Sequence, residues 1–186
     1  MDYFTSDLHI GHDKDFIWGS RGFNSIEEHD TQILKNWNST VTYEDTVYIL
    51  GDLCMGGNEK EWNRIYENLN GNIIFIIGNH DTSNKIDKYV FNYEMICEGH
   101  ASLYKYSKKY NFYLSHYPTY TANYDDNKKH PLINLHGHTH QKTKFFNNNP
   151  YMYNVALDAH NCMPISIEQI IKDIEEAKNS MQKIQF

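Results

Sequence analysis

Several short apolar segments of this chain run directly into Asp, Asn or His, usually beside a glycine. Thr46–Leu50 is followed by Gly51 and Asp52, and Ile73–Ile77 is followed by Gly78 and Asn79. Apolar runs of this length are typical of buried strands, and glycine lets the backbone turn sharply close to an ion. Because function gathers where apolar strands end in polar loops, we expect these strand ends to form one site.

In the first half of the chain, these strands alternate with helices. Ser25–Glu28 has a capping-box pattern and predicts a helix through about Trp37, and Glu59–Leu69 predicts another. A second capping box, Ser166–Gln169, opens an apolar stripe with helical spacing. The second half is mainly strands. The other expected strands are Tyr3–Ser6, Leu103–Tyr106, Phe112–Ser115, Ile133–Leu135 and Tyr151–Val155. This order predicts an α/β fold with mixed sheets and outer helices.

The length and charge of the chain narrow the possible functions. Its 186 residues suit one domain, and no run approaches the roughly 18 apolar residues of a membrane span. The N-terminus lacks the pattern of a signal peptide, so we expect a cytoplasmic protein. The net charge of −7 argues against a strong nucleic-acid-binding surface. The only basic concentrations are Lys105/Lys108/Lys109 and Lys128/Lys129.

The residues at the strand ends are those that bind divalent metal ions. Carboxylate, imidazole and amide oxygen suit Mn, Fe and Zn, and the absence of Cys among them disfavours a structural zinc site. Two ions about 4 Å apart can clamp the attacking and leaving oxygens of a phosphoryl displacement. Asp52 is the natural carboxylate to bridge them. The blocks are Asp7-Leu8-His9, Gly51-Asp52, Gly78-Asn79-His80-Asp81, His116 and Gly137-His138-Thr139-His140.

These blocks, in this order, resemble the calcineurin-like metallophosphoesterase family. The family pattern is D-x-H, G-D, G-N-H-D/E, H and G-H-x-H, and every block is present between residues 7 and 140. The opening FTSDLHIGH looks most like the small bacterial and phage-borne members. The resemblance implies a four-layer α/β/β/α sandwich of two mixed sheets, with a metal site at the strand ends.

The resemblance also implies a role for each residue of the pattern. It implies two divalent ions, with Mn preferred and Fe, Zn, Ni or Mg as alternatives, and a metal-bound hydroxide as the nucleophile. His80 would stabilise the transition state and protonate the leaving oxygen, and Asp81 would orient or charge its imidazole. The implied ligands are Asp7, His9 and His140 for the first ion, Asn79, His116 and His138 for the second, and Asp52 for both.

Two residues outside the pattern are candidates for contact with substrate. His12 lies at the rim of the site or is an ordinary loop residue. Arg21 is the best single candidate for a phosphate clamp, because guanidinium matches phosphate bidentately, but an ordinary exposed loop arginine is the preferred interpretation. His136 and Asp158 receive no role.

The predicted function is hydrolysis of a small phosphate ester or nucleotide, with the oligomeric state open. A diester is preferred over a monoester because Tyr117, Tyr120 and Tyr124 could stack a base, although tyrosines in loops often only pack. The alternative is a binding scaffold that has the fold without the activity. A metallo-β-lactamase-like enzyme is disfavoured, because its H-x-H-x-D-H run is incomplete around His136–His140.

Overall fold

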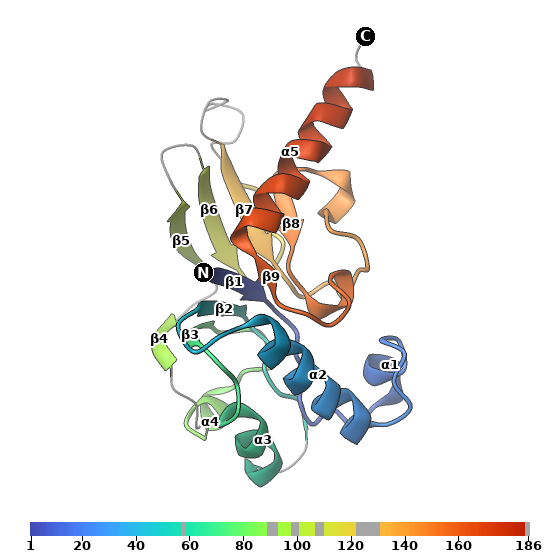
Figure 1. The fold of residues 1–186 in the computed structure, drawn as a ribbon, viewed down its shortest axis with the longest axis vertical. Coiled ribbons are helices and arrows are strands. Elements are labelled where there is room, and N and C mark those ends of the chain that lie inside the picture. The colour runs from blue at the N-terminus through green and yellow to red at the C-terminus, as the bar shows by residue number, and fades with distance from the viewer. Residues whose placement is uncertain (57–58, 89–92, 98–100, 107–109, 122–130, 185–186) are drawn as a thin grey trace.

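Two β-sheets form the centre of the computed structural model (Figure 1). It describes residues 1–56, 59–88, 93–97, 101–106, 110–121 and 131–184. The sheets have the strand orders β4-β3-β2-β1-β9 and β5-β6-β7-β8. The predicted mixed α/β fold with two sheets is confirmed.

The first sheet brings three loops to one edge. Strands β1 (Asp2–Thr5), β2 (Thr46–Leu50), β3 (Asn72–Ile76) and β4 (Tyr93–Cys97) are parallel, and the short β9 (Ile165–Ser166) is antiparallel to β1. The carboxyl ends of parallel strands lie at the same edge of a sheet. The segments that follow β1, β2 and β3 are therefore neighbours.

The second sheet meets the first at that edge. Its strands are β5 (Ala101–Tyr106), β6 (Tyr110–Ser115), β7 (Leu132–His136) and β8 (Met152–Asn154). Strands β6, β7 and β8 are parallel, and β5 is antiparallel to β6. Just beyond β1 and β8, Ser6 and Ala156 form an isolated parallel bridge, which holds the ends of the two sheets together.

Two clusters of buried apolar side chains fix this arrangement. In the first, Ile33 and Trp37 of α2 (Ile26–Thr40) pack with Val47 and Phe75 of the first sheet. Helix α3 (Glu59–Tyr66) also joins this cluster through Ile65. The second cluster combines residues of both sheets with α5 (Ile167–Ile184) and includes Phe4, Leu50, Phe112, Leu135 and Ile170.

The remaining elements are short and lie mostly in the connections. They are α1 (Asp15–Trp18), α4 (Ser83–Ile86) and the 3-10 turns η1 (Phe146–Asn148) and η2 (Leu157–Ala159). Sequence analysis did not predict these elements, β4 or β9. The short elements and β9 have at most four residues, too few to show a period, and the apolar run of β4 is interrupted by Glu94. Among the described residues, no helix has the length and apolar character needed to cross a membrane.

The two capping boxes expected from the sequence both lie at the starts of helices. Ser25 accepts a hydrogen bond from the backbone N–H of Glu28, and Ser166 accepts one from that of Gln169. Helix α2 continues to Thr40, beyond the predicted end at Trp37, and α3 stops at Tyr66, short of Leu69. Helix α5 packs in the apolar cluster that contains residues of both sheets. The predicted α/β/β/α order of four layers therefore stays a prediction.

Candidate metal centre

The strand-end loops bring all seven expected ligands to one place. Two of them follow β1, one follows β2 and one follows β3, so four come from the first sheet. The other three follow β6 and β7 of the second sheet. The centre therefore lies where the two sheets meet. In chain order the residues are Asp7, His9, Asp52, Asn79, His116, His138 and His140.

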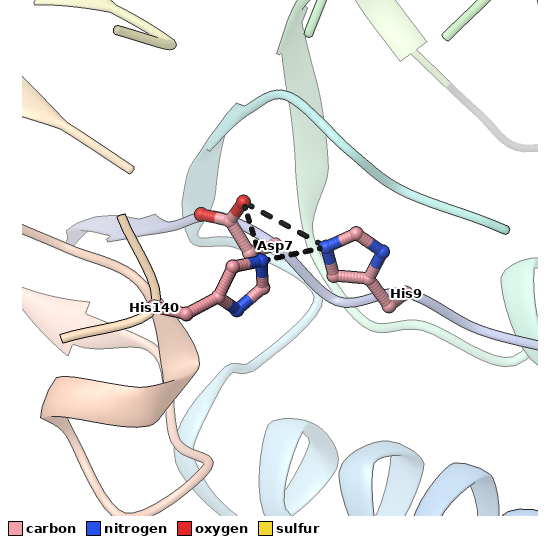
Figure 2. A group of neighbouring side chains, drawn as sticks. All are labelled: Asp7, His9 and His140. Carbon is pink, nitrogen blue, oxygen red and sulfur yellow. Dashed lines mark hydrogen bonds and ion pairs between the residues drawn. The ribbon is translucent and has the colours of Figure 1, made fainter. Parts of the chain in front are cut away.

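Asp7, His9 and His140 form the first group of ligand atoms (Figure 2). The Nε2 atoms of His9 and His140 are 3.2 Å apart, and each lies 3.8 Å from Oδ1 of Asp7. Burial lowers the pKa of His9 far below its ordinary value, so its imidazole is neutral and can offer a lone pair to a metal.

The Asp7 carboxylate is the strongest sign that this group fits a cation. Its Oδ2 accepts hydrogen bonds from the Ser6 hydroxyl at 2.6 Å and from the His138 backbone N–H at 2.8 Å. Its Oδ1 is buried, has no hydrogen-bond partner and faces the two imidazoles. An unpaired buried carboxylate oxygen is unfavourable, and a bound cation would satisfy it.

Asn79, His116 and His138 form the second group. Oδ1 of Asn79 lies 2.7 Å from Nε2 of His116 and 2.9 Å from Nδ1 of His138, and the two nitrogens are 3.2 Å apart. Oδ2 of Asp52 lies 3.4 Å from Nε2 of His116 and 3.9 Å from Nε2 of His9. Asp52 is thus placed between the two groups, where one carboxylate could reach two ions.

The backbone at these positions is held in an unusual conformation. Asp7, His9, Asp52, His138 and His140 all have positive φ, between 50° and 69°. Residues with a Cβ adopt this left-handed region at a cost of roughly 1–3 kcal/mol each, and such strain is characteristic of functional sites. The turns aim successive polar side chains at the centre.

Two glycines allow the loops to approach one another. A Cβ on Gly78 would lie 2.3 Å from Oδ1 of Asp52, and one on Gly137 would lie 1.9 Å from the Ser6 hydroxyl oxygen. Both distances are shorter than any real contact between such atoms. The G-N-H-D and G-H-x-H patterns therefore need glycine for space at these positions.

His80 lies beside the ligands, and its side chain is partly exposed to solvent. Its backbone N–H donates to Oδ1 of Asp52 at 2.9 Å, and its Nε2 lies 3.9 Å from Oδ2 of the same carboxylate. The side chain is 38% exposed. Lys85 holds this loop by donating hydrogen bonds to the carbonyl oxygens of His80 and Cys54.

Asp81 joins the loops that follow β2 and β3. Its Oδ2 accepts hydrogen bonds from the backbone N–H groups of Asp52 and Gly78, and its Oδ1 accepts one from Leu53. These contacts position the loop that carries Asp52. The expected action of Asp81 on the His80 imidazole stays a prediction.

Arg21 is neither an exposed loop arginine nor available as a phosphate clamp, so both interpretations from the sequence are wrong. Its side chain is 1% exposed and forms a bidentate ion pair with Asp158, with distances of 3.1 Å from Nε and 2.8 Å from Nη2. The other N–H groups contact the carbonyl oxygens of Asp7 and Leu8 and the ring of His29. All five donors of the guanidinium are therefore engaged within the protein.

Asp158 links this arginine to a metal ligand, a role that sequence analysis left unassigned. Its Oδ2 lies 3.0 Å from Nδ1 of His140, so that Nδ1 donates a proton and Nε2 points to Asp7. Burial acts to raise the pKa of Asp158, but hydrogen bonds from His140 and Arg21 outweigh burial and hold this pKa well below its usual range. Asp158 thus stays ionised.

The other two histidines near the centre differ in their surroundings. His12 is buried, and its Nδ1 accepts a hydrogen bond from the backbone N–H of Lys14. His136 is fully buried against the ring of Phe146, and burial lowers its pKa to about 4. His136 therefore serves as a neutral packing residue behind the ligand loop.

An open cleft of about 390 Å³ lies over the centre. Four expected metal ligands line it together with His80, and so do Met55 and residues of the segment around α1. No Lys or Arg lines it among the residues that the structure describes. The lining residues are His9, His12, Phe16, Ile17, Ser20, Asp52, Met55, His80, His138 and His140.

Comparison with known proteins identifies the family. The model of the calcineurin-like phosphoesterases matches residues 3–182. The chain belongs to this family. It is 34% identical to an uncharacterised protein of Methanocaldococcus jannaschii, over 95% of this chain and 92% of that protein. It is 31% identical to the gene 66 protein of Mycobacterium phage D29, over 94% and 97%.

A solved structure shares the fold. It is a protein of unknown function from Aquifex aeolicus, with a TM-score of 0.72, 25% identity, and coverage of 92% of this chain and 98% of that one. The predicted resemblance to small phage-type members of the family is confirmed. Family membership points to phosphoester hydrolysis, and the two ligand groups are candidate positions for divalent metal.

Replacing Arg21 by Met should destabilise the metal-free protein by about 3–5 kcal/mol, because it leaves the buried Asp158 carboxylate without its cation. Urea denaturation in the presence of a chelator measures this loss. Lys14→Met is the matched control: its ion pair with Asp13 is exposed and should contribute less than about 1 kcal/mol. Equal losses in the two variants would contradict the buried role of Arg21.

Proposed function

We propose that this protein hydrolyses phosphodiesters with two divalent ions, preferably Mn. The observation that supports this most strongly is the pair of ligand groups, which share the Asp52 carboxylate. Asp7, His9 and His140 would hold one ion, and Asn79, His116 and His138 the other. The donor set of carboxylate, imidazole and amide oxygen suits Mn, Fe or Zn.

The chemistry divides between the ions and the protein. When bound, the ions would supply positive charge against the phosphate and lower the pKa of the attacking water. The chain's own residues orient these groups. Asp158 fixes the ring of His140, and Asp81 fixes the loop of Asp52, so both ligands are held in place before substrate arrives.

His80 is the proposed proton donor. Its imidazole lines the cleft and is partly exposed, while its backbone is tied to Asp52. As the water oxygen bonds to phosphorus, the bond from phosphorus to the leaving oxygen breaks. His80 gives its proton to that oxygen, and the products are an alcohol and a phosphomonoester. The attacking water releases a proton to solvent, and solvent reprotonates His80 for the next turnover.

The charges around the cleft favour a diester over a monoester. A diester carries one negative charge on phosphorus and a monoester carries two. The described lining of the cleft offers imidazoles but no Lys or Arg, and the guanidinium of Arg21 is occupied by Asp158. The substrate class proposed is therefore a small phosphodiester, including nucleotide diesters.

Purified protein reconstituted with Mn should bind close to two ions per chain, and Asp52→Asn should weaken both, because one carboxylate serves both groups. Elemental analysis after gel filtration measures the content. Asp45→Asn is the control, since Asp45 pairs with the N-terminus and Thr42 away from the centre. Two ions retained in Asp52→Asn would exclude the bridging role.

With Mn bound, the protein should hydrolyse bis-p-nitrophenyl phosphate at least about tenfold more efficiently than p-nitrophenyl phosphate, and a chelator should abolish both activities. The comparison is made as kcat/KM at one pH, because the two substrates share a leaving group and differ in charge. A preference for the monoester would refute the diesterase assignment. Bound metal without turnover of either ester would instead support the catalytically silent scaffold.

His80→Ala should lower the rate about 10²–10⁴-fold for an ester with an alkoxide leaving group while both ions remain bound. The loss should be much smaller for a p-nitrophenolate leaving group, which hardly needs a proton. Steady-state kinetics on a matched pair of diesters, with metal analysis of the same sample, makes the test. An equal loss for both would assign His80 to electrostatic stabilisation, and loss of metal would make it a ligand.

A further inference from the structure

One wall of the cleft is apolar, although phosphate chemistry alone requires no apolar surface. Phe16, Ile17 and Met55 line the cleft together with Asp52 and His80. Ile17 is buried, whereas Phe16 is 66% exposed. Single exposed apolar residues are common on protein surfaces, but this ring lines the cleft that holds the candidate metal ligands.

The position of Phe16 is fixed relative to the metal ligands by a row of rings. The rings of His9 and His12 lie 5.6 Å apart, and those of His12 and Phe16 lie 5.3 Å apart, in both cases nearly perpendicular. The ring of His12 is itself held by its hydrogen bond from the backbone of Lys14. His12 therefore contacts both Phe16 and His9, and it links Phe16 to a ligand of the first group.

The tyrosines that sequence analysis suggested for base stacking are placed differently. The ring of Tyr117 packs against those of His116 and His138, at 5.2 and 4.5 Å, and supports the second ligand group. Neither Tyr117 nor the exposed Tyr120 is among the residues that line the cleft, and Tyr124 lies outside the described residues. Phe16 is the aromatic carbon ring that the described lining offers.

We propose that Phe16, with Ile17 and Met55, forms a subsite that binds an aromatic group on the ester that is not expelled, such as a nucleoside base or an aryl ring. This inference rests on the proposed phosphodiesterase function and specifies its substrate class. An aromatic ring stacks on the exposed Phe16 while its phosphate lies at the metal ligands. A substrate whose retained ester group is a small alkyl leaves the subsite empty and gains nothing from it, whatever its leaving group.

The test compares two diesters that share the p-nitrophenolate leaving group: phenyl p-nitrophenyl phosphate and methyl p-nitrophenyl phosphate. In the Mn-loaded full-length protein, Phe16→Ala should lower kcat/KM about 3- to 10-fold for the phenyl ester and less than about twofold for the methyl ester. Phe16→Leu keeps apolar area without a ring and should give an intermediate loss. Tyr43→Ala removes an aromatic ring that is 81% exposed away from the cleft and should change neither value.

A binding measurement keeps the two proposals separable. Calorimetry with diphenyl phosphate and dimethyl phosphate should show that Phe16→Ala weakens only the diphenyl compound, whether or not turnover occurs. Equal effects of Phe16→Ala on both ligands, or no effect on either, would overturn the subsite. Hydrolysis of both esters without discrimination at Phe16 would refute the subsite and leave the phosphodiesterase intact. Aryl-selective binding without any turnover would refute the phosphodiesterase.

Discussion

The structure depends on the close approach of strand ends from two sheets. The loops that follow these strands can pack together only because their backbone turns tightly. Asp7, Asp52 and His138 accept left-handed conformations there, and Gly78 and Gly137 leave room for neighbouring atoms. Hydrogen bonds into the turns offset this strain. The Asp81 carboxylate alone receives three backbone N–H groups. The geometry of the centre is therefore set by the backbone before any ion or substrate is considered.

Electrostatics follows from that geometry. Burial raises the pKa of Asp52, as expected for a carboxylate withdrawn from water. The Arg21 guanidinium, which could have compensated substrate charge, compensates Asp158 inside the protein. Under the proposed function, bound cations would supply the positive charge that the described lining of the cleft does not offer through Lys or Arg. This division would allow an acidic chain with a net charge of −7 to act on an anionic ester, as proposed.

The sequence predicted the fold class and the residues that meet at the centre, because each ligand block directly follows its own strand. It did not predict the partner of Arg21, since Asp158 lies 137 residues away and the pair has no local pattern. Phe16 was also missed, because a lone aromatic residue in a loop carries no signal of exposure. Four lysines of the basic clusters, Lys108, Lys109, Lys128 and Lys129, lie outside the described residues, so the expected lack of a strong nucleic-acid-binding surface stays a prediction.

The division of the ligands between the two sheets has a consequence for folding. His140 and His9 come from different sheets, and so do His116 and Asp52. An ion bound in either group would link the two sheets, in addition to the apolar cluster that the sheets share. A ligand that binds only the folded state raises its stability in proportion to the logarithm of the ligand concentration. The concentration of available metal would then set the free energy of unfolding of the chain as well as its activity.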